Sequence, residues 1–495
     1  MDFSGNSSKF ASSKCEDSMK QYIYLLIFTI ACLSATGMPG YAVPSKETSQ
    51  KTKYPDRKSY IYRFVLRDKQ GTPFSLERPR EFLSRKSIER RRRQNLPVDS
   101  TDLPVNPDYI HMLATAGTKI IGTSRWNNSV LAVTTDTAAI APLRRLGCVK
   151  ECTMVWQSPD SIIPLSRHYN YHDTFNSWDS VKTSPYGASE KQIATLNGMA
   201  LHKKGYTGQG MTIAVLDGGF RNADNIPAIS RIRKAGTRDF VYPPSKNIYR
   251  ETDHGTKVLS VMGTHVPHIY IGTAPAATYW LLRCEDTRTE QPVEEDYWTM
   301  AAEFADSVGV DVINSSIGYN QYDHHYGDHR YHDMNGRTTL ISRSASMLAG
   351  KGIVLVCSAG NSGMGSWKKI VFPADADDII TVGALTPQLV NAPFSGIGPT
   401  QDGRVKPDVM APGSPVSVIS GRGTVAPDIG TSFASPIVCG LVACLWQAHP
   451  EMTARDIIET VRRYADNYAT PDNIFGYGIP DFKSALDSLP KNRVE

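Results

Sequence analysis

The pattern of hydrophobic and polar positions divides this chain into two structural units. The first is a mixed pattern of strands and helices over residues 43–156, which predicts a small α+β unit. Its expected elements are strands at 60–66, 130–134 and up to Trp156, and helices at 79–95 and 138–146.

From residue 192 onward, apolar strands and helices alternate along the chain. This alternation predicts an α/β fold with a largely parallel sheet and helices on both faces. Functional residues in such sheets lie at the carboxyl ends of the strands, and Asp217, Asn314 and Asn361 follow predicted strands there. The expected elements are strands at 211–216, 278–283, 310–314 and 353–358, and helices at 192–204, 295–308 and 339–351.

Three residues of the second unit lie in local sequences that suit nucleophilic catalysis. Asp217 ends an apolar run, His254 opens the sequence His-Gly-Thr-Lys-Val, and Ser432 lies in Gly-Thr-Ser-Phe-Ala-Ser-Pro before a helical pattern. A serine hydroxyl needs a base to remove its proton, and a histidine with a pKa of about 6.5 can supply it. A carboxylate on the other ring nitrogen fixes the tautomer and stabilises the imidazolium.

These motifs, in the order Asp-His-Ser, resemble those of the subtilisin-like serine proteases, the subtilases, over roughly residues 192–489. The resemblance implies a serine endopeptidase that acts through an acyl-enzyme on Ser432 and requires no cofactor. Gly218 stands where many subtilases have Ser or Thr, a difference that leaves the carboxylate of Asp217 intact. An α/β-hydrolase would need a Gly-x-Ser-x-Gly motif and a serine before the histidine, and the sequence has neither.

The same resemblance implies further site residues. Asn361 would be the side-chain donor of the oxyanion hole, although an asparagine between glycines is also typical of a left-handed turn. Ser316, Ile317 and Gly318 would edge the specificity pocket on a strand that binds extended peptide. An ordinary strand with a polar end is the alternative for these three residues.

Small α+β units precede many subtilase catalytic domains, where they are chaperones and inhibitors removed on maturation. The resemblance thus implies a self-processed zymogen whose own prosegment is its inhibitor; an independent binding domain is the alternative for that unit. For the whole chain, the alternative is a catalytically weak subtilase-like protein that serves as a peptide-binding module. The implied domains are a prosegment at 43–156, a linker with the maturation cut at 157–188, a catalytic domain at 189–490 and a tail at 491–495.

Residues 1–42 have the features of a secretory signal peptide, with Met19 as an alternative start. The apolar run 22–33 is too short to span a bilayer comfortably, and Gly40-Tyr41-Ala42 is a small-x-small cleavage pattern. We therefore expect an extracytoplasmic protein, secreted or periplasmic, without a transmembrane span. Lipid attachment at Cys32 is an alternative use of this segment.

Charge and composition add few constraints. A formal net charge of +5 over 495 residues gives no argument for nucleic acid, so we expect peptide or protein substrates. The run of four arginines at 90–93 is interpreted as a solvated helical face, rather than a processing site or a patch for an anionic partner. The cysteines form no evident disulfide framework.

No metal-ligand pattern is defined by the sequence. The insert 319–335, rich in Tyr, His and Asp, is interpreted as a polar surface loop near the cleft. Subtilases often bind structural calcium, and Asp333, Asn335 and Asp375 are oxygen donors whose spacing does not define a site.

Overall fold

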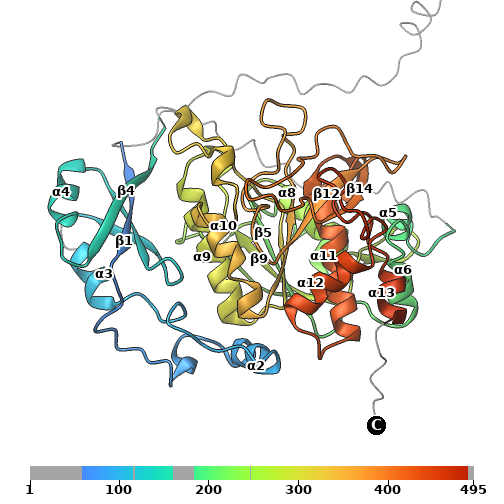
Figure 1. Cartoon of the computed structure of the whole chain (residues 1–495), viewed down its shortest axis with the longest axis horizontal. Coiled ribbons are helices and arrows are strands. Elements are labelled where there is room, and N and C mark those ends of the chain that lie inside the picture. Colours follow the sequence, from blue (N-terminus) through green and yellow to red (C-terminus); the bar gives the residue numbers. More distant parts are fainter. Residues whose placement is uncertain (1–57, 115–116, 160–182, 246, 489–495) are drawn as a thin grey trace, which may run out of the picture. The chain divides into compact units, whose positions relative to one another are not determined.

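A seven-stranded sheet, parallel throughout, forms the centre of the larger unit (Figure 1). The computed structural model describes residues 58–114, 117–159, 183–245 and 247–488. The expected signal peptide, most of the expected linker and the expected tail lie outside these residues. In spatial order the strands are β13 (Val409–Pro412), β12 (Ile380–Leu385), β11 (Val354–Ser358), β10 (Val312–Ser315), β5 (Thr212–Asp217), β9 (Thr278–Arg283) and β6 (Lys234–Asp239).

Helices cover both faces of this sheet, which confirms the predicted fold class. Successive residues of β5 point to opposite faces, so that Ile213 and Val215 join one hydrophobic core while Ala214 and Leu216 join the other. The first core is covered by α8 (His254–Gly263), α11 (Thr431–Ala448), α12 (Ala454–Arg463) and α13 (Phe482–Ser488). The second is covered by α9 (Val293–Val308) and α10 (Leu340–Ser346).

Within the described residues, α11 is the one helix long and apolar enough to cross a membrane, and it is buried along most of its length in the core. The six cysteines of the described part are free thiols, as expected from the sequence. The remaining short elements of the larger unit are α7 (Pro227–Ser230), η4 (Asp323–His325), η5 (Tyr331–Asp333), and the two-stranded pairs β7 (His265–Val266) with β8 (Tyr270–Ile271) and β14 (Val416–Ile419) with β15 (Val425–Asp428).

Two helices of the larger unit are shorter than their patterns predict. The expected helix 192–204 is divided into α5 (Glu190–Ala194) and α6 (Met199–Lys203), because Asn197 has a positive φ and Gly198 packs against Leu441. A Cβ at Gly198 would lie 2.5 Å from the Leu441 side chain, so this close contact requires glycine. The expected helix 339–351 is α10 followed by the 3₁₀ turn η6 (Ala349–Lys351).

The N-terminal unit is a four-stranded antiparallel sheet with short helices, which confirms the predicted α+β pattern. Its strands, in spatial order, are β2 (Lys119–Ser124), β3 (Ser129–Thr134), β1 (Tyr60–Leu66) and β4 (Val149–Gln157). Its helical segments are η1 (Pro79–Glu81), α2 (Arg85–Arg93), α3 (Pro107–Ala114), η2 (Thr137–Ala139) and α4 (Ile140–Leu143). Ile61, Leu131 and Trp156 of this sheet join the second hydrophobic core, the one that α9 and α10 cover.

The sequence overestimated two helices here and missed β2 and α3. The expected helix 79–95 begins only at Arg85, because Ser84 caps α2 by accepting a hydrogen bond from the Ser87 backbone N–H. The expected helix 138–146 is reduced to the short segments η2 and α4.

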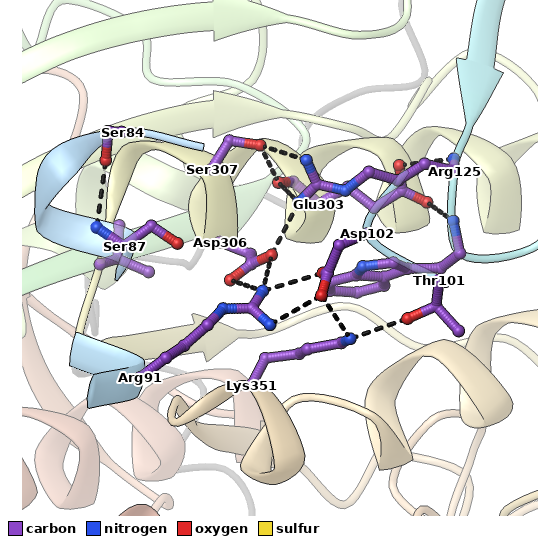
Figure 2. A network of polar contacts seen from close by, with 12 residues as sticks. Ser84, Ser87, Arg91, Thr101, Asp102, Arg125, Glu303, Asp306, Ser307 and Lys351 are labelled. Atoms are coloured by element: carbon purple, nitrogen blue, oxygen red, sulfur yellow. Dashed lines mark hydrogen bonds and ion pairs between the residues drawn. The ribbon is translucent and has the colours of Figure 1, made fainter. Parts of the chain in front are cut away.

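Half of the arginine run is buried, which corrects the interpretation of a solvated helical face. Arg90 and Arg91 are each 1% exposed, whereas Arg92 and Arg93 are exposed. Figure 2 shows Arg91 between two carboxylates, bonded to Asp102 at 2.9 Å and to Asp306 of α9 at 2.8 Å. Burying an ion pair requires that every charge be matched, and this network meets that condition through contacts far apart in sequence.

The network binds the N-terminal unit to the side of the sheet formed by the amino-terminal ends of the strands. Arg90 donates hydrogen bonds to the backbone oxygens of Val310 and Lys351, which precede β10 and β11. Arg125, from the turn between β2 and β3, also pairs with Asp306 at 2.6 Å. Helix α2 thus packs against the amino-terminal ends of the strands, opposite to their carboxyl ends, where a catalytic site is expected.

Candidate active site

Asp217 and His254 are brought together at the carboxyl end of β5. The His254 ring nitrogen Nδ1 lies 3.0 and 2.9 Å from the two carboxylate oxygens of Asp217, which is fully buried. Gly255 allows this approach, since a Cβ there would lie 2.5 Å from the Gly219 oxygen and 2.9 Å from the Asp217 Cβ. The glycine after His254 therefore lets the start of α8 pack against the strand end.

The carboxylate determines the protonation of this histidine. Burial of the ring by itself lowers the pKa of His254, but the charge and hydrogen bond of Asp217 outweigh it and, with a smaller contribution from Glu285, raise it to about 9. Nδ1 faces Asp217, so the proton-accepting nitrogen of the neutral ring is Nε2.

Ser432 is the second residue of α11 and is bound to the end of β10. Its hydroxyl donates to the Ser316 backbone oxygen at 3.4 Å, and the Ser316 hydroxyl donates to the Ser432 backbone oxygen at 2.8 Å. Gly430, at the N-cap of α11, has φ +150°, a backbone conformation that favours glycine. The Gly-Thr-Ser motif thus starts a helix in which the backbone N–H groups of Thr431 and Phe433 are bonded to Asn361 and Gly430. The Ser432 N–H between them is left for a developing negative charge.

Asn361 is held in a fixed orientation beside Ser432. Its side-chain oxygen accepts hydrogen bonds at 3.0 Å from both the backbone N–H and the hydroxyl of Thr431. The positive φ at this turn, +93°, belongs to Gly360, and Asn361 lies outside the left-handed region. The left-handed-turn alternative for Asn361 is therefore wrong, and its amide nitrogen is left to donate elsewhere.

The predicted site residues line a single cavity of about 480 Å³. His254, Ser316, Ile317, Gly318, Asn361 and Ser432 all contribute to its wall, and Asp217 lies behind His254. Asp217 is thus the one predicted site residue that does not line the cavity. This is expected for a carboxylate that contacts the base rather than the substrate.

Several wall residues were missed by sequence reasoning, and Glu285 and Val371 are two of them. Glu285 comes two residues after β9, at the same edge of the sheet as Asp217, and this position was the available signal. A Cβ at Gly218 would lie 2.7 Å from the Glu285 carboxylate. This close contact explains why this chain has glycine where many subtilases have Ser or Thr. Val371 gave no local signal; its methyl group lies 2.3 Å from where a Cβ on Gly318 would be and 2.6 Å from one on Gly360.

Comparison with known proteins agrees with this geometry. Residues 208–478 match the sequence model of the subtilase family. The chain belongs to the subtilase family. It is 30% identical over 293 residues to subtilisin E of Bacillus subtilis (strain 168), covering 57% of this chain and 67% of that protein.

Other relatives are similar over the same part of this subtilase. Identity is 30% over 290 residues to the subtilisin of Bacillus pumilus, covering 57% of this chain and 92% of that protein. It is 28% over 334 residues to the serine protease AprX of Bacillus subtilis (strain 168), covering 60% and 70%. Residues 61–168 match the peptidase S8 propeptide domain of Bacteroidota. This subtilase is therefore a serine-type endopeptidase made as a zymogen.

The oxygen donors considered for calcium bind the protein itself. Asp333 accepts from the Arg330 backbone, Asn335 from the backbone of Arg337 and Thr338, and Asp375 from Gly336 and Ser342.

The insert 319–335 is only partly a polar surface loop, which corrects its interpretation. Tyr319 and Tyr322 are buried, because the Tyr322 hydroxyl and His329 both bond to Glu295 of α9.

Proposed function

We propose that this subtilase hydrolyses peptide bonds with Ser432 as nucleophile, His254 as general base and Asp217 as the carboxylate that orients the base. The observation that carries this proposal is that His254 bonds to Asp217 on one side and lines the same cavity as Ser432 on the other. Binding of a substrate would turn the Ser432 hydroxyl away from the Ser316 oxygen and toward Nε2 of His254. His254 would then return the proton to the leaving amine, and water would hydrolyse the acyl-enzyme by the reverse path.

The oxyanion of the tetrahedral intermediate would be bound by the Asn361 amide and by the Ser432 backbone N–H at the start of α11. Thr431 supports this role because it holds the Asn361 oxygen, which leaves the amide nitrogen free to face the reacting carbonyl. Such pre-oriented donors stabilise charge that develops only in the transition state.

Substrate would lie as an extended strand against Ser316, Ile317 and Gly318. Gly318 and Gly360 face the Val371 side chain, which limits the depth of the space between these two segments. The pocket therefore favours a small or medium apolar side chain before the scissile bond.

We further propose that residues 43–156 are the prosegment, that the catalytic domain covers 189–490 and that residues 491–495 are a tail. The maturation cut then falls in the linker 157–188, and the end of the propeptide match at residue 168 supports a cut after that residue. The end of β4 leads toward the active site, because Gln157 and the Gln291 side chain, just before α9, exchange two hydrogen bonds of 2.9 and 3.0 Å. This approach supports self-processing, with the prosegment as inhibitor.

The proposed location is extracytoplasmic, after removal of the signal peptide 1–42 or a shorter one that begins at Met19. Lipid anchoring at Cys32 is the variant of this proposal that mass analysis distinguishes, since an acylated N-terminus has a defined added mass. The proposed substrates are peptides or proteins, and the chemistry uses no cofactor.

Intact-mass and N-terminal analysis of the wild-type chain and Ser432→Ala, both made in a protease-free host, tests the proposal. The wild-type chain should separate into prosegment and enzyme and should cleave a neutral peptide, whereas Ser432→Ala should remain one unprocessed chain without activity. Equal processing of both chains would refute self-cleavage. A wild-type chain that binds peptides without cleaving them would favour the alternative of a peptide-binding module.

A further inference from the structure

Three glutamates of one short segment face one another beside the candidate active site. Glu285, Glu290 and Glu294 each place one carboxylate oxygen within 4.8 Å of the other two. Glu285 lines the cavity together with His254, whereas Glu294 lies in the first turn of α9 and is 0% exposed. Like charges this close in a desolvated site repel one another strongly, so the group requires a positive partner to ionise.

The surrounding protein does not supply that partner to Glu294. Both of its carboxylate oxygens are buried without a hydrogen bond of normal geometry, and the neighbouring Tyr319 hydroxyl, which stabilises the carboxylate, carries no charge. The next two residues of α9 show how this fold satisfies buried carboxylates: Glu295 binds His329, Tyr322 and the Ile341 N–H, and Asp296 pairs with Arg63. Burial and the neighbouring glutamates raise the pKa of Glu294 well above its usual value. Glu294 is thus an exception within its own helix.

A second buried group faces the same place. The Tyr319 hydroxyl, in a residue 1% exposed, interacts with Glu294 but reaches no hydrogen bond of normal geometry, and it lies in the electrostatic field of Glu294, Glu285 and Glu290. The Thr289 hydroxyl, in the same segment as the glutamates, is also buried without a partner. Buried polar groups are nearly always satisfied, so several unpaired oxygens in one segment indicate a missing ligand.

We propose that Glu285, Glu290 and Glu294 bind a divalent cation of the calcium type at the side of the substrate cavity. Calcium takes six to eight oxygen ligands at about 2.3–2.6 Å, so two ligands of one ion can lie up to about 5 Å apart, which the three carboxylates satisfy. The ion would neutralise the group and fix the segment 285–294 that forms one wall of the cavity. The site does not depend on the proposed catalytic roles and is distinct from Asp333, Asn335 and Asp375.

Thermal unfolding of the full chain tests this site in a Ser432→Ala background, which prevents self-cleavage. After treatment with a chelator, calcium at about a hundredfold excess over its Kd should raise the Tm by on the order of 5 °C. Glu290→Gln/Glu294→Gln should abolish this rise and, because it removes the charge repulsion, should raise the calcium-free Tm. Asp333→Asn, which alters a carboxylate that lines a different cavity, is the matched control and should retain the full rise.

Terbium, which replaces calcium at oxygen sites, gives a second readout. Its luminescence should be excited through Tyr319 in the parent chain and should be lost in Glu290→Gln/Glu294→Gln. If the double variant does not fold, the single variant Glu290→Gln at the partly exposed side of the group provides the same comparison. A glutamine variant that keeps the parental calcium rise, or a parent chain with neither a rise nor sensitised terbium emission, would overturn the proposal.

Discussion

Ser316 and Ser432 are bound to each other twice, although 116 residues separate them. Each hydroxyl donates to the backbone oxygen of the other residue, at 2.8 Å from Ser316 and 3.4 Å from Ser432. Asn314 extends this link, since its amide donates to the Ser316 hydroxyl and its oxygen accepts from Ser435. The end of β10 thus fixes the start of the helix that presents the proposed nucleophile.

Ser316→Ala removes one of the two bonds without touching the backbone. We expect a loss of about 2 kcal/mol in the free energy of unfolding, because the buried hydrogen bonds from Ser316 to Ser432 and from Asn314 to Ser316 both disappear. The kcat should fall about tenfold, since the position of the Ser432 hydroxyl becomes less fixed. Kinetics and denaturant unfolding measure the two effects, and an unchanged kcat would show that β10 does not position the nucleophile.

Asn361→Leu tests the proposed oxyanion donor. Its kcat should fall about 100-fold or more, roughly 3 kcal/mol of transition-state stabilisation, while KM stays nearly unchanged. Because Asn361 has an ordinary backbone conformation, leucine introduces no left-handed strain. Its side chain also loses two bonds to Thr431, so Thr431→Val serves as a control for that structural contribution. A folded Asn361→Leu enzyme with full kcat would refute the assignment.

The pH dependence of kcat/KM on a neutral peptide tests His254. The ring must be neutral to accept a proton, and Asp217 raises its pKa to about 9 against the lowering effect of burial. Activity should therefore fall as the pH decreases, with the acid limb above the ordinary histidine value of about 6.5.

Asp217→Asn provides the comparison for this limb. The substitution removes the charge that favours imidazolium, so the limb of the residual activity should move to lower pH, while kcat drops by about 10⁴. A limb that does not move would assign the titration to another group. Glu285 is the first to examine, since burial and Asp217 raise its pKa to about 7.

Val371→Gly should change which peptides are cleaved. The valine fills the space between the facing residues Gly318 and Gly360, so its removal deepens the pocket. We expect kcat/KM to rise for peptides with Phe or Tyr before the scissile bond and to fall for those with Ala, by about tenfold or more in their ratio. A peptide series that differs at this one residue measures the ratio, and an unaltered ratio would contradict the proposed position of the substrate side chain.

Asp306→Ala should strongly destabilise the unprocessed chain, studied as Ser432→Ala. It removes the carboxylate that balances the charges of the buried Arg90 and Arg91. The free energy of unfolding, measured with denaturant, should fall by about 3–5 kcal/mol. Arg93→Ala, from the same arginine run, is the matched control: its side chain is 56% exposed and lies 3.8 Å from Asp311, so the change should stay within about 0.5 kcal/mol. Similar losses in both variants would contradict the importance of the buried network.

Acid should weaken the same network. Burial favours the protonated form of Asp306, but Arg90, Arg91 and Arg125 outweigh it and hold the pKa of this carboxyl below its ordinary value. A depressed pKa contributes stability that is complete above the unfolded-state pKa, about 3.9, and is lost as the pH falls through the folded-state value. Unfolding measured below about pH 4 should show this loss in the parent chain and not in Asp306→Asn.

Sequence reasoning succeeded where the signal is local. The expected strand 278–283 coincides with β9, because a strand buried on both faces is a continuous apolar run. The motifs around Asp217, His254 and Ser432 likewise contain the glycines and the helix start that position each side chain. These features are encoded within a few residues of each functional group.

The failures depend on partners distant in sequence. The burial of Arg91 requires Asp306, 215 residues away, and nothing in the arginine run indicates it. Gly198 interrupts an otherwise helical pattern to accommodate Leu441. Val371 enters the cavity wall only because two separate glycine-containing segments approach it. In each case tertiary packing overrides the local pattern.

The N-terminal unit contacts the central sheet at two opposite edges. Gln157 is held near the substrate edge through Gln291, whereas Gln94 binds Gly352 and Ala454 at the other. A cut in the linker breaks none of these bonds. Maturation would then yield a two-chain complex, and the delay before the enzyme becomes active would be set by dissociation or digestion of the bound chain rather than by the cleavage event.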